Sequence, residues 1–140
     1  MSKKTGLRKQ VRRLIRNWAV PVGCGLFFLF LLKSIFFIGY VPSTSMEPAI
    51  HKESFIFGLR VHGELQRGDV VVFEHGGRLL VKRIAGIQGD LVYASDEKSM
   101  TVPEGCYFML GDNLENSDDS RGWDEPFVEN SQIIAKAAIR

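Results

Sequence analysis

The sequence predicts a mainly β fold: a single compact antiparallel β domain preceded by one N-terminal transmembrane helix. Residues 18–40 are apolar except for glycines, Pro21, Ser34 and one charge, Lys33, and a helix of this length is long enough to cross a hydrocarbon core of about 30 Å. From residue 34 onward, segments rich in Val, Ile, Phe and Tyr alternate with turns rich in Gly, Asp and Ser. Such alternation is typical of short antiparallel strands.

The charge distribution predicts the orientation of the chain in a membrane. Residues 1–17 carry seven basic and no acidic residues, whereas residues 41–140 carry ten basic and sixteen acidic residues. Basic residues before a membrane span favour a cytoplasmic N-terminus, with the remaining chain on the outer, periplasmic or extracellular, side. A nucleic-acid-binding arm is disfavoured because the apolar span follows at once and the rest of the chain is acidic. The basic tail also has amphipathic spacing, with apolar residues at Leu7, Val11, Leu14, Ile15 and Trp18.

Lys33 limits the part of the helix that lies in the bilayer. Its ammonium is expected to reach the outer interface, which leaves Trp18–Leu32 in the hydrocarbon. The predicted organisation is a basic amphipathic tail on the cytoplasmic side (1–17), a transmembrane helix (18–33) and an extracytoplasmic β-rich domain (34–140). A cleaved signal peptide is the alternative, because residues 43–45 imitate a small-x-small cleavage site. The length of the apolar stretch favours a retained helix, and a mature chain beginning near Met46 would contradict it.

The outer segment contains the strand signals in a regular order. The tripeptide His75-Gly76-Gly77 predicts a hairpin turn between two of the strands. No helix of ordinary length is predicted after residue 41. The predicted strands are Ile35–Val41, Ser54–Leu59, Asp69–Glu74, Arg78–Ile87, Leu91–Ala94, Thr101–Val102, Tyr107–Leu110 and Gln132–Ile139.

The cysteines and histidines predict neither a disulfide within the chain nor a metal site. Cys24 lies in the membrane span and Cys106 in the outer domain, so they are not expected to pair. Cys106 is expected to be buried and reduced, or to form an intermolecular bridge. His51, His62 and His75 are too scattered for a zinc site. We therefore expect no cofactor and no metal.

Ser45 is a candidate nucleophile in the loop Pro42–Pro48, which follows the membrane span. A serine hydroxyl is unreactive unless a base lies beside it, and a serine in such a loop is by itself an ordinary turn residue. The two prolines stiffen the loop on both sides of the hydroxyl. Met46 and Ile50 offer apolar contacts, either with the edge of the bilayer or with the core.

Lys82 is a candidate general base. Strand alternation places it on one face with Leu80 and Ile84, and burial on an apolar face lowers the pKa of an amine. A lysine on an edge strand that extends its amine to solvent is the structural alternative. The segment Gly111–Arg121 contains several possible oxygen ligands, but their spacing does not match an EF-hand, so the segment does not predict a calcium site.

Three motifs together resemble the type I signal peptidases (leader peptidases). They are Ser43-x-Ser45-Met46 after a membrane span, Val81-Lys82-Arg83 followed by Gly86-x-x-Gly89-Asp90, and Gly111–Arg121. The resemblance implies a β domain of the signal-peptidase type with Ser45 as nucleophile and Lys82 as general base. It also implies that the hydroxyl of Ser43 and the main-chain N–H of Ser45 stabilise the oxyanion.

The same resemblance implies a set of supporting contacts around the dyad. Ser117 would hydrogen-bond Lys82 and orient it. Asp119 and Arg121 would form an ion pair, and Asp112 would pair with Arg83. Between Gly89 and Gly111 the chain has room for only a hairpin, so it is expected to be a short form that lacks the inserted second domain of larger members.

The function implied is that of a membrane-anchored serine endopeptidase, which removes N-terminal signal peptides from secreted preproteins through an acyl-enzyme. Its expected partners are the lipid bilayer and preproteins bound as an extended strand with small residues at the P1 and P3 positions; no nucleic acid and no metal are expected. One alternative is a specialised conjugation- or pilus-maturation peptidase of the same clan. A non-catalytic, membrane-tethered pilus-assembly module is disfavoured, because the chain keeps both Ser45 and Lys82.

Overall fold

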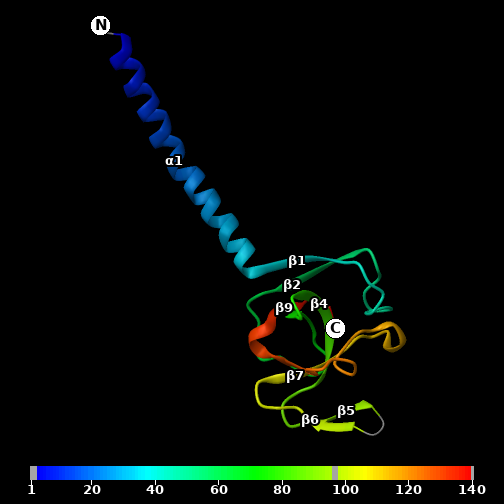
Figure 1. The fold of residues 1–140 in the computed structure, drawn as a ribbon. Helices are drawn as coiled ribbons and strands as arrows, with labels where there is room; N and C mark the ends of the chain where they lie inside the picture. Colours follow the sequence, from blue (N-terminus) through cyan, green and yellow to red (C-terminus); the bar gives the residue numbers. More distant parts are fainter. Residues whose placement is uncertain (1–2, 96–97, 140) are drawn as a thin grey trace. The chain divides into compact units, whose positions relative to one another are not determined.

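The computed structural model describes residues 3–95 and 98–139, which form one long helix followed by a β domain (Figure 1). The helix and the β domain are two separate units that divide after Ile35. Two short 3-10 helices, η1 (Leu114–Asn116) and η2 (Asn130–Gln132), lie in the β domain. The helix is α1 (Lys3–Ile35), and the strands are β1 (Phe36–Val41), β2 (Ser54–Leu59), β3 (Val70–His75), β4 (Arg78–Gly86), β5 (Leu91–Ser95), β6 (Lys98–Thr101), β7 (Cys106–Leu110), β8 (Phe127–Glu129) and β9 (Ile133–Ala137).

Helix α1 runs from the basic tail into the apolar segment. Residues Asn17–Ile35 form a stretch with a mean hydropathy of 1.8, long and apolar enough to cross a membrane. Pro21 lies inside the helix, which membrane helices tolerate. Residues 3–17 therefore belong to the same helix as the predicted span, and their position on the inner membrane face stays a prediction.

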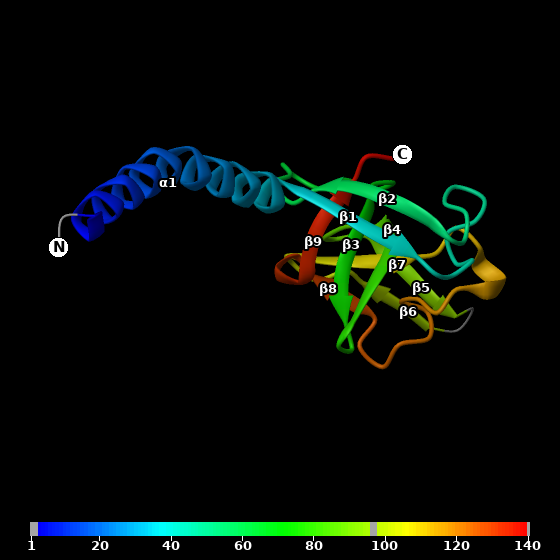
Figure 2. The ribbon, with the colours of Figure 1, turned by 90° about the horizontal axis from the view of Figure 1, so that it is seen from above.

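The β domain is built from antiparallel pairs, as the sequence predicted. Seven strands form one sheet in the order β1-β2-β9-β3-β4-β7-β8, and β5 and β6 pair as a separate hairpin. Figure 2 shows β3 and β4 in the middle of the sheet, and Figure 1 shows the β5–β6 hairpin apart from it. This hairpin occupies the short segment where an inserted domain was expected to be missing.

The β3–β4 hairpin confirms the turn predicted at His75-Gly76-Gly77. Gly76 and Gly77 have φ angles of 57° and 73°, a left-handed conformation that side chains other than glycine rarely adopt. The resulting register pairs Lys82 with Val71. The turn therefore determines where along the sheet Lys82 stands.

Alternate residues of β4 enter two different apolar clusters. Val81 packs against a cluster that contains Val72, Met46 and Ile50, whereas Leu80 and Ile84 belong with Val71 and Phe73. Met46 is 0% exposed and Ile50 is 4% exposed. Of the two environments predicted for Met46 and Ile50, the structure therefore shows the core of the β domain.

The outer face of the β1–β2 ribbon is apolar and exposed. The two strands pair so that Phe36 faces Leu59, and the next two outward pairs follow the same register. Six large side chains on this face are 44–65% exposed. They are Phe36, Ile38, Tyr40, Phe55, Phe57 and Leu59.

Two strands differ from the sequence prediction. The predicted strand Thr101–Val102 is instead β6, Lys98–Thr101, because the backbone of Val102 leaves the hairpin to bond with Asp90 and Gly89. Strand β8 was not predicted. It has three residues, too few for an alternating pattern to stand out.

Candidate active site

Ser45 lies in the loop between β1 and β2 and is 8% exposed. Its neighbour Met46 is held in the core, as described above. The loop is also closed by backbone hydrogen bonds from Glu47 N to Thr44 O at 3.1 Å and from Ile50 N to Met46 O at 2.8 Å. The loop, here called the serine loop (residues 42–50), is therefore fixed by both packing and hydrogen bonds.

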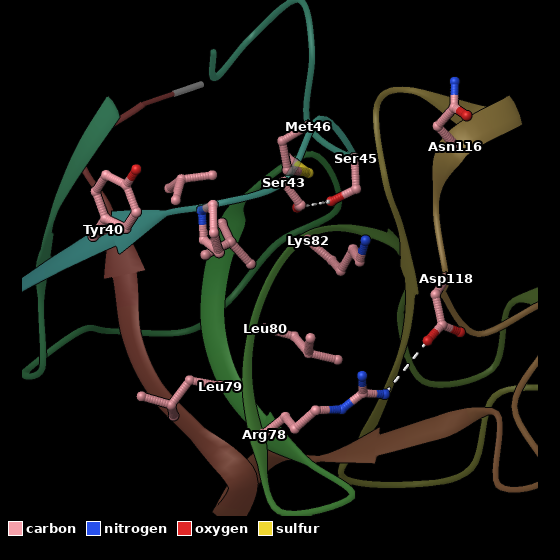
Figure 3. A pocket seen from close by; sticks show the side chains of 13 residues that line it. Tyr40, Ser43, Ser45, Met46, Arg78, Leu79, Leu80, Lys82, Asn116 and Asp118 are labelled. Atoms are coloured by element: carbon pink, nitrogen blue, oxygen red, sulfur yellow. Dashed lines mark hydrogen bonds and ion pairs between the residues drawn. The ribbon is translucent and has the colours of Figure 1, made fainter. Parts of the chain in front are cut away.

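The hydroxyls of Ser43 and Ser45 lie side by side. Their Oγ atoms are 3.2 Å apart (Figure 3). Ser43 is exposed, whereas Ser45 is buried. The structure thus brings together the two serines that the resemblance assigned to nucleophilic attack and oxyanion stabilisation.

Lys82 is buried. It stands in the part of β4 that pairs with β3 alone, because pairing with β7 begins at Arg83, but Lys82 is only 3% exposed. Its Nζ donates a hydrogen bond to Ser117 Oγ at 2.9 Å. The alternative of a lysine that extends its amine to solvent is therefore wrong.

Burial lowers the pKa of Lys82 below the ordinary lysine value of 10.5. The negative charges of Asp119 and Asp118 act in the opposite direction, and the positive charge of Arg121 adds to the lowering. Because burial dominates, a larger fraction of Lys82 is neutral near pH 7 than of a solvated lysine. Only the neutral amine can accept a proton.

Ser117 connects Lys82 to a buried carboxylate. Asp119 is 1% exposed and accepts hydrogen bonds from Ser117, Arg121 and the N–H of Gly111. Burial works against ionised Asp119, but these hydrogen bonds outweigh it and lower the pKa of the carboxyl. The ion pair between Arg121 Nε and Asp119 Oδ1 measures 2.8 Å.

Arg83 and Asp112 form the second expected ion pair. The guanidinium donates through Nε and Nη2 to the two carboxylate oxygens of Asp112, at 2.8 and 2.7 Å, and through Nη1 to the carbonyl of Gly68 at 2.7 Å. Arg83 follows Lys82 in β4, so its side chain leaves the opposite face of the strand. This pair ties β4 to the segment that carries Ser117.

A pocket of about 360 Å³ brings the candidate residues together. One side is formed by residues 40–43, Ser45 and Met46 and the other by residues 78–82 of β4, with Asn116 and Asp118 at the rim. Ser43, Ser45 and Lys82 all line it (Figure 3). Among the hydrogen bonds of the described residues, Ser45 Oγ pairs with Ser43 and Lys82 Nζ with Ser117, and none joins Ser45 directly to Lys82.

Two features of this site, the partners of Asp118 and the tight packing at Gly111, were not predicted from the sequence. Asp118 pairs with Arg78 at 3.5 Å and accepts a hydrogen bond from Trp123 Nε1 at 2.8 Å. Arg78 and Asp118 are forty positions apart, and no local pattern connects them. Gly111 has no room for a side chain, since a Cβ there would lie 2.5 Å from the carbonyl oxygen of Ser45. This close approach is also invisible in the sequence.

The structure also locates the residues considered for a disulfide or a metal. Cys24 is exposed, Cys106 is half-buried, and both are free. Within residues 3–95 and 98–139, no group of three or more His, Cys, Asp or Glu side chains is arranged to hold a metal ion.

Comparison with known proteins gives one consistent family. A profile of the family "Signal peptidase, peptidase S26" matches residues 15–98 and 93–140. Signal peptidase I of Pseudomonas fluorescens is 28% identical, covering 80% of this chain and 67% of the relative. Signal peptidase I S of Bacillus subtilis is 28% identical, covering 79% of this chain and 80% of the relative.

A mitochondrial protein also matches this chain. A mitochondrial ATP-independent inner membrane protease subunit 1b of Arabidopsis thaliana is 33% identical, covering 62% of this chain and 60% of the relative. The family profile covers the apolar part of the helix, the serine loop, β4 and the segment with Ser117. The chain therefore belongs to the signal peptidase family, peptidase S26.

Proposed function

We propose that this chain is a membrane-anchored serine endopeptidase that removes N-terminal signal peptides from secreted preproteins, with Ser45 as nucleophile and Lys82 as general base. The observation that carries the proposal is a lysine only 3% exposed, with a lowered pKa, lining the same pocket as a buried serine. Membership in the signal peptidase family supports the reaction and the class of substrate.

The proposed reaction has two halves. Neutral Lys82 takes the proton of Ser45 Oγ as this oxygen attacks the carbonyl carbon of the cleaved bond, and the resulting ammonium then gives the proton to the leaving amine. The acyl-enzyme is hydrolysed by a water that Lys82 deprotonates in turn. Before attack, the hydroxyl of Ser45 must turn from Ser43 toward Lys82, and such contacts often form only when substrate is bound.

Oxyanion stabilisation is assigned to two donors on the serine loop. The hydroxyl of Ser43 lies 3.2 Å from Ser45 Oγ, and the main-chain N–H of Ser45 belongs to the same residue as the proposed nucleophile. Donors fixed before the reaction stabilise the tetrahedral intermediate without reorganisation. Ser117 and Asp119 are proposed to orient Lys82, and Arg121 is proposed to hold Asp119. Arg83 and Asp112 are proposed to hold the segment that carries Ser117 against β4.

The pocket supports binding of the substrate as an extended strand. Strand β4 pairs with β7 only from Arg83 onward, so residues 78–82 have backbone groups that an added strand could bind. The pocket wall is apolar at Tyr40, Leu79 and Val81. A pocket of this size is proposed to accept small residues at the first and third positions before the cleaved bond.

Replacing Ser45 by alanine tests the proposed nucleophile. The variant should fold normally, because it loses only one hydroxyl, and its preprotein cleavage should fall to the background rate. Cleavage is measured on a full preprotein in detergent micelles, and mass spectrometry follows covalent labelling by an acylating inhibitor. Labelling at Ser45 in the wild type and none in Ser45→Ala is the expected result. Unchanged cleavage by Ser45→Ala would remove the serine mechanism.

The proposed topology places the N-terminus in the cytoplasm and the β domain at the outer membrane surface. Seven basic residues precede the apolar segment, and the exposed apolar face of the β1–β2 ribbon supports contact of this domain with lipid. Protease added outside right-side-out membrane vesicles should digest the β domain and leave a fragment that contains residues 1–33. Full protection of the β domain from the added protease would show that the chain has the opposite orientation.

A further inference from the structure

Asn113 contacts the serine loop with both its backbone and its side chain. Its N–H donates to the carbonyl oxygen of Ser45 at 3.0 Å, and its side-chain Nδ2 donates to the carbonyl oxygen of Thr44 at 3.3 Å. These carbonyls belong to the two peptide groups that flank the Cα of Ser45. One asparagine, 69 positions from Thr44 in sequence, therefore holds both peptide groups around the proposed nucleophile.

The peptide group between Thr44 and Ser45 determines where the Ser45 N–H points. This peptide is trans, and in a planar trans peptide the C=O and N–H point in opposite directions. The carbonyl of Thr44 has two donors, Asn113 Nδ2 and the N–H of Glu47 at 3.1 Å. Holding the oxygen on one side directs the Ser45 N–H to the other. Within the described part of the chain no acceptor binds this N–H, so it is available to a ligand.

Asn113 is itself held in place. Its carbonyl accepts the N–H of Asn116 at 3.1 Å, which closes the turn of η1. The loop approaches the serine loop closely because Gly111 has no side chain. The side chain of Asn113 is partly buried and acts here as a donor, whereas a metal site would have used its oxygen.

We propose that Asn113 is a positioning residue for oxyanion stabilisation, whose side-chain amide fixes the Thr44–Ser45 peptide group so that the Ser45 N–H faces the reacting carbonyl. The inference rests on the proposed function, because this N–H is an oxyanion donor only if Ser45 is the nucleophile. Without the amide, the N–H of Glu47 alone holds the Thr44 carbonyl and the peptide group can rotate. An interaction that matters only when the oxyanion forms changes kcat and leaves KM nearly unchanged.

The test compares Asn113→Asp and Asn113→Ala with wild type, as full chains in detergent micelles. Asn113→Asp keeps the shape of the side chain but offers only acceptor oxygens to the Thr44 carbonyl. Removal of a direct oxyanion donor costs about 10²–10³ in kcat, and an indirect role predicts a loss of about tenfold. KM should stay within about twofold of wild type, because the pocket walls are untouched. Glu115→Gln, an exposed change in the 3-10 helix η1 that follows Asn113, is the matched control and should retain full activity.

A pair of inhibitors separates orientation of the oxyanion donor from general loss of structure. A peptide aldehyde forms a hemiacetal oxyanion with the serine, whereas the corresponding peptide alcohol cannot. Both Asn113 variants should bind the aldehyde about tenfold more weakly and the alcohol as wild type does, by the same argument as for kcat. Thermal unfolding measured in parallel should show little change for Asn113→Asp.

Each other outcome overturns the inference. Wild-type kcat and aldehyde affinity in both variants would show that Asn113 does not position the donor. Equal weakening of aldehyde and alcohol, or a raised KM with unchanged kcat, would assign Asn113 to substrate binding or to stability alone. Ser45→Ala in the same assay distinguishes failure of the proposed function: if it cleaves as wild type does, the serine mechanism fails and the role of Asn113 fails with it.

Discussion

Lys82→Met should abolish preprotein cleavage while the protein remains folded. Methionine fills a volume similar to that of lysine but has no amine, so Ser45 loses its proton acceptor. General-base catalysis contributes about 10²–10⁴ to a rate, and we expect a loss of about 10³ or more in kcat. Burial of an uncharged side chain in place of an amine that is 3% exposed should leave the thermal midpoint the same or higher.

Lys82→Arg should fail for a different reason. A guanidinium stays protonated at every pH at which the protein is folded and cannot accept a proton. It also buries a permanent charge, so this variant should be less stable than Lys82→Met. Lys52→Met, which removes an exposed lysine near the serine loop, is the matched control and should retain wild-type kcat. A kcat above about a tenth of wild type in Lys82→Met would exclude Lys82 as the base, since the loss would fall short of base catalysis.

Gly111→Ala should cost about 10² in kcat/KM, because the added methyl group has no space. A Cβ at this position would lie 2.5 Å from the carbonyl oxygen of Ser45 and 2.6 Å from Ser117 Cβ, far inside van der Waals contact. Relief of the clash must displace the serine loop or Ser117, and a misplacement of about 1 Å at an active site can cost about 10² in rate. Displacement of Ser117 would weaken the support of Lys82, and displacement of the serine loop would move Ser45.

Gly122→Ala is the matched control for Gly111→Ala. The nearest atom to a Cβ at Gly122 is the carbonyl oxygen of Asp119, at 3.9 Å, an ordinary contact. This variant should keep wild-type kcat/KM and a wild-type thermal midpoint. Wild-type activity in Gly111→Ala would contradict the tight packing of Ser45 and Ser117 around residue 111.

Local patterns predicted the parts of the fold that depend on short-range signals. The glycine turn at residues 76–77 and the alternation in β4 were enough to predict the β3–β4 hairpin and the face that carries Lys82. The apolar segment predicted α1, but the basic tail and the membrane span were predicted as separate segments, whereas the structure has one helix through both. The three-residue strand β8 has no such signal, and only its pairing with β7 defines it.

The site was predicted through motifs rather than through geometry. The contacts of Lys82 with Ser117, of Arg83 with Asp112 and of Asp119 with Arg121 are present as the resemblance implied. The catalytic roles of these residues stay predictions. Two contacts at the site join segments that are distant in sequence: the hydrogen bonds of Asn113 to Thr44 and Ser45, and the ion pair of Arg78 with Asp118. Each depends on distances in the folded protein, which no sequence pattern reveals.

Direct titration of the Lys82 amine tests the central claim, that a buried neutral lysine activates Ser45. The measurement is NMR of the full chain in micelles with 13Cε-labelled lysine, with the Lys82 signal assigned by its loss in Lys82→Met. The pKa should lie below the ordinary 10.5, because burial lowers it, and the acylation rate should rise with pH through that same pKa as the amine becomes neutral. A Lys82 amine that titrates at the ordinary lysine value, or an acylation rate that does not follow its titration, would contradict the mechanism.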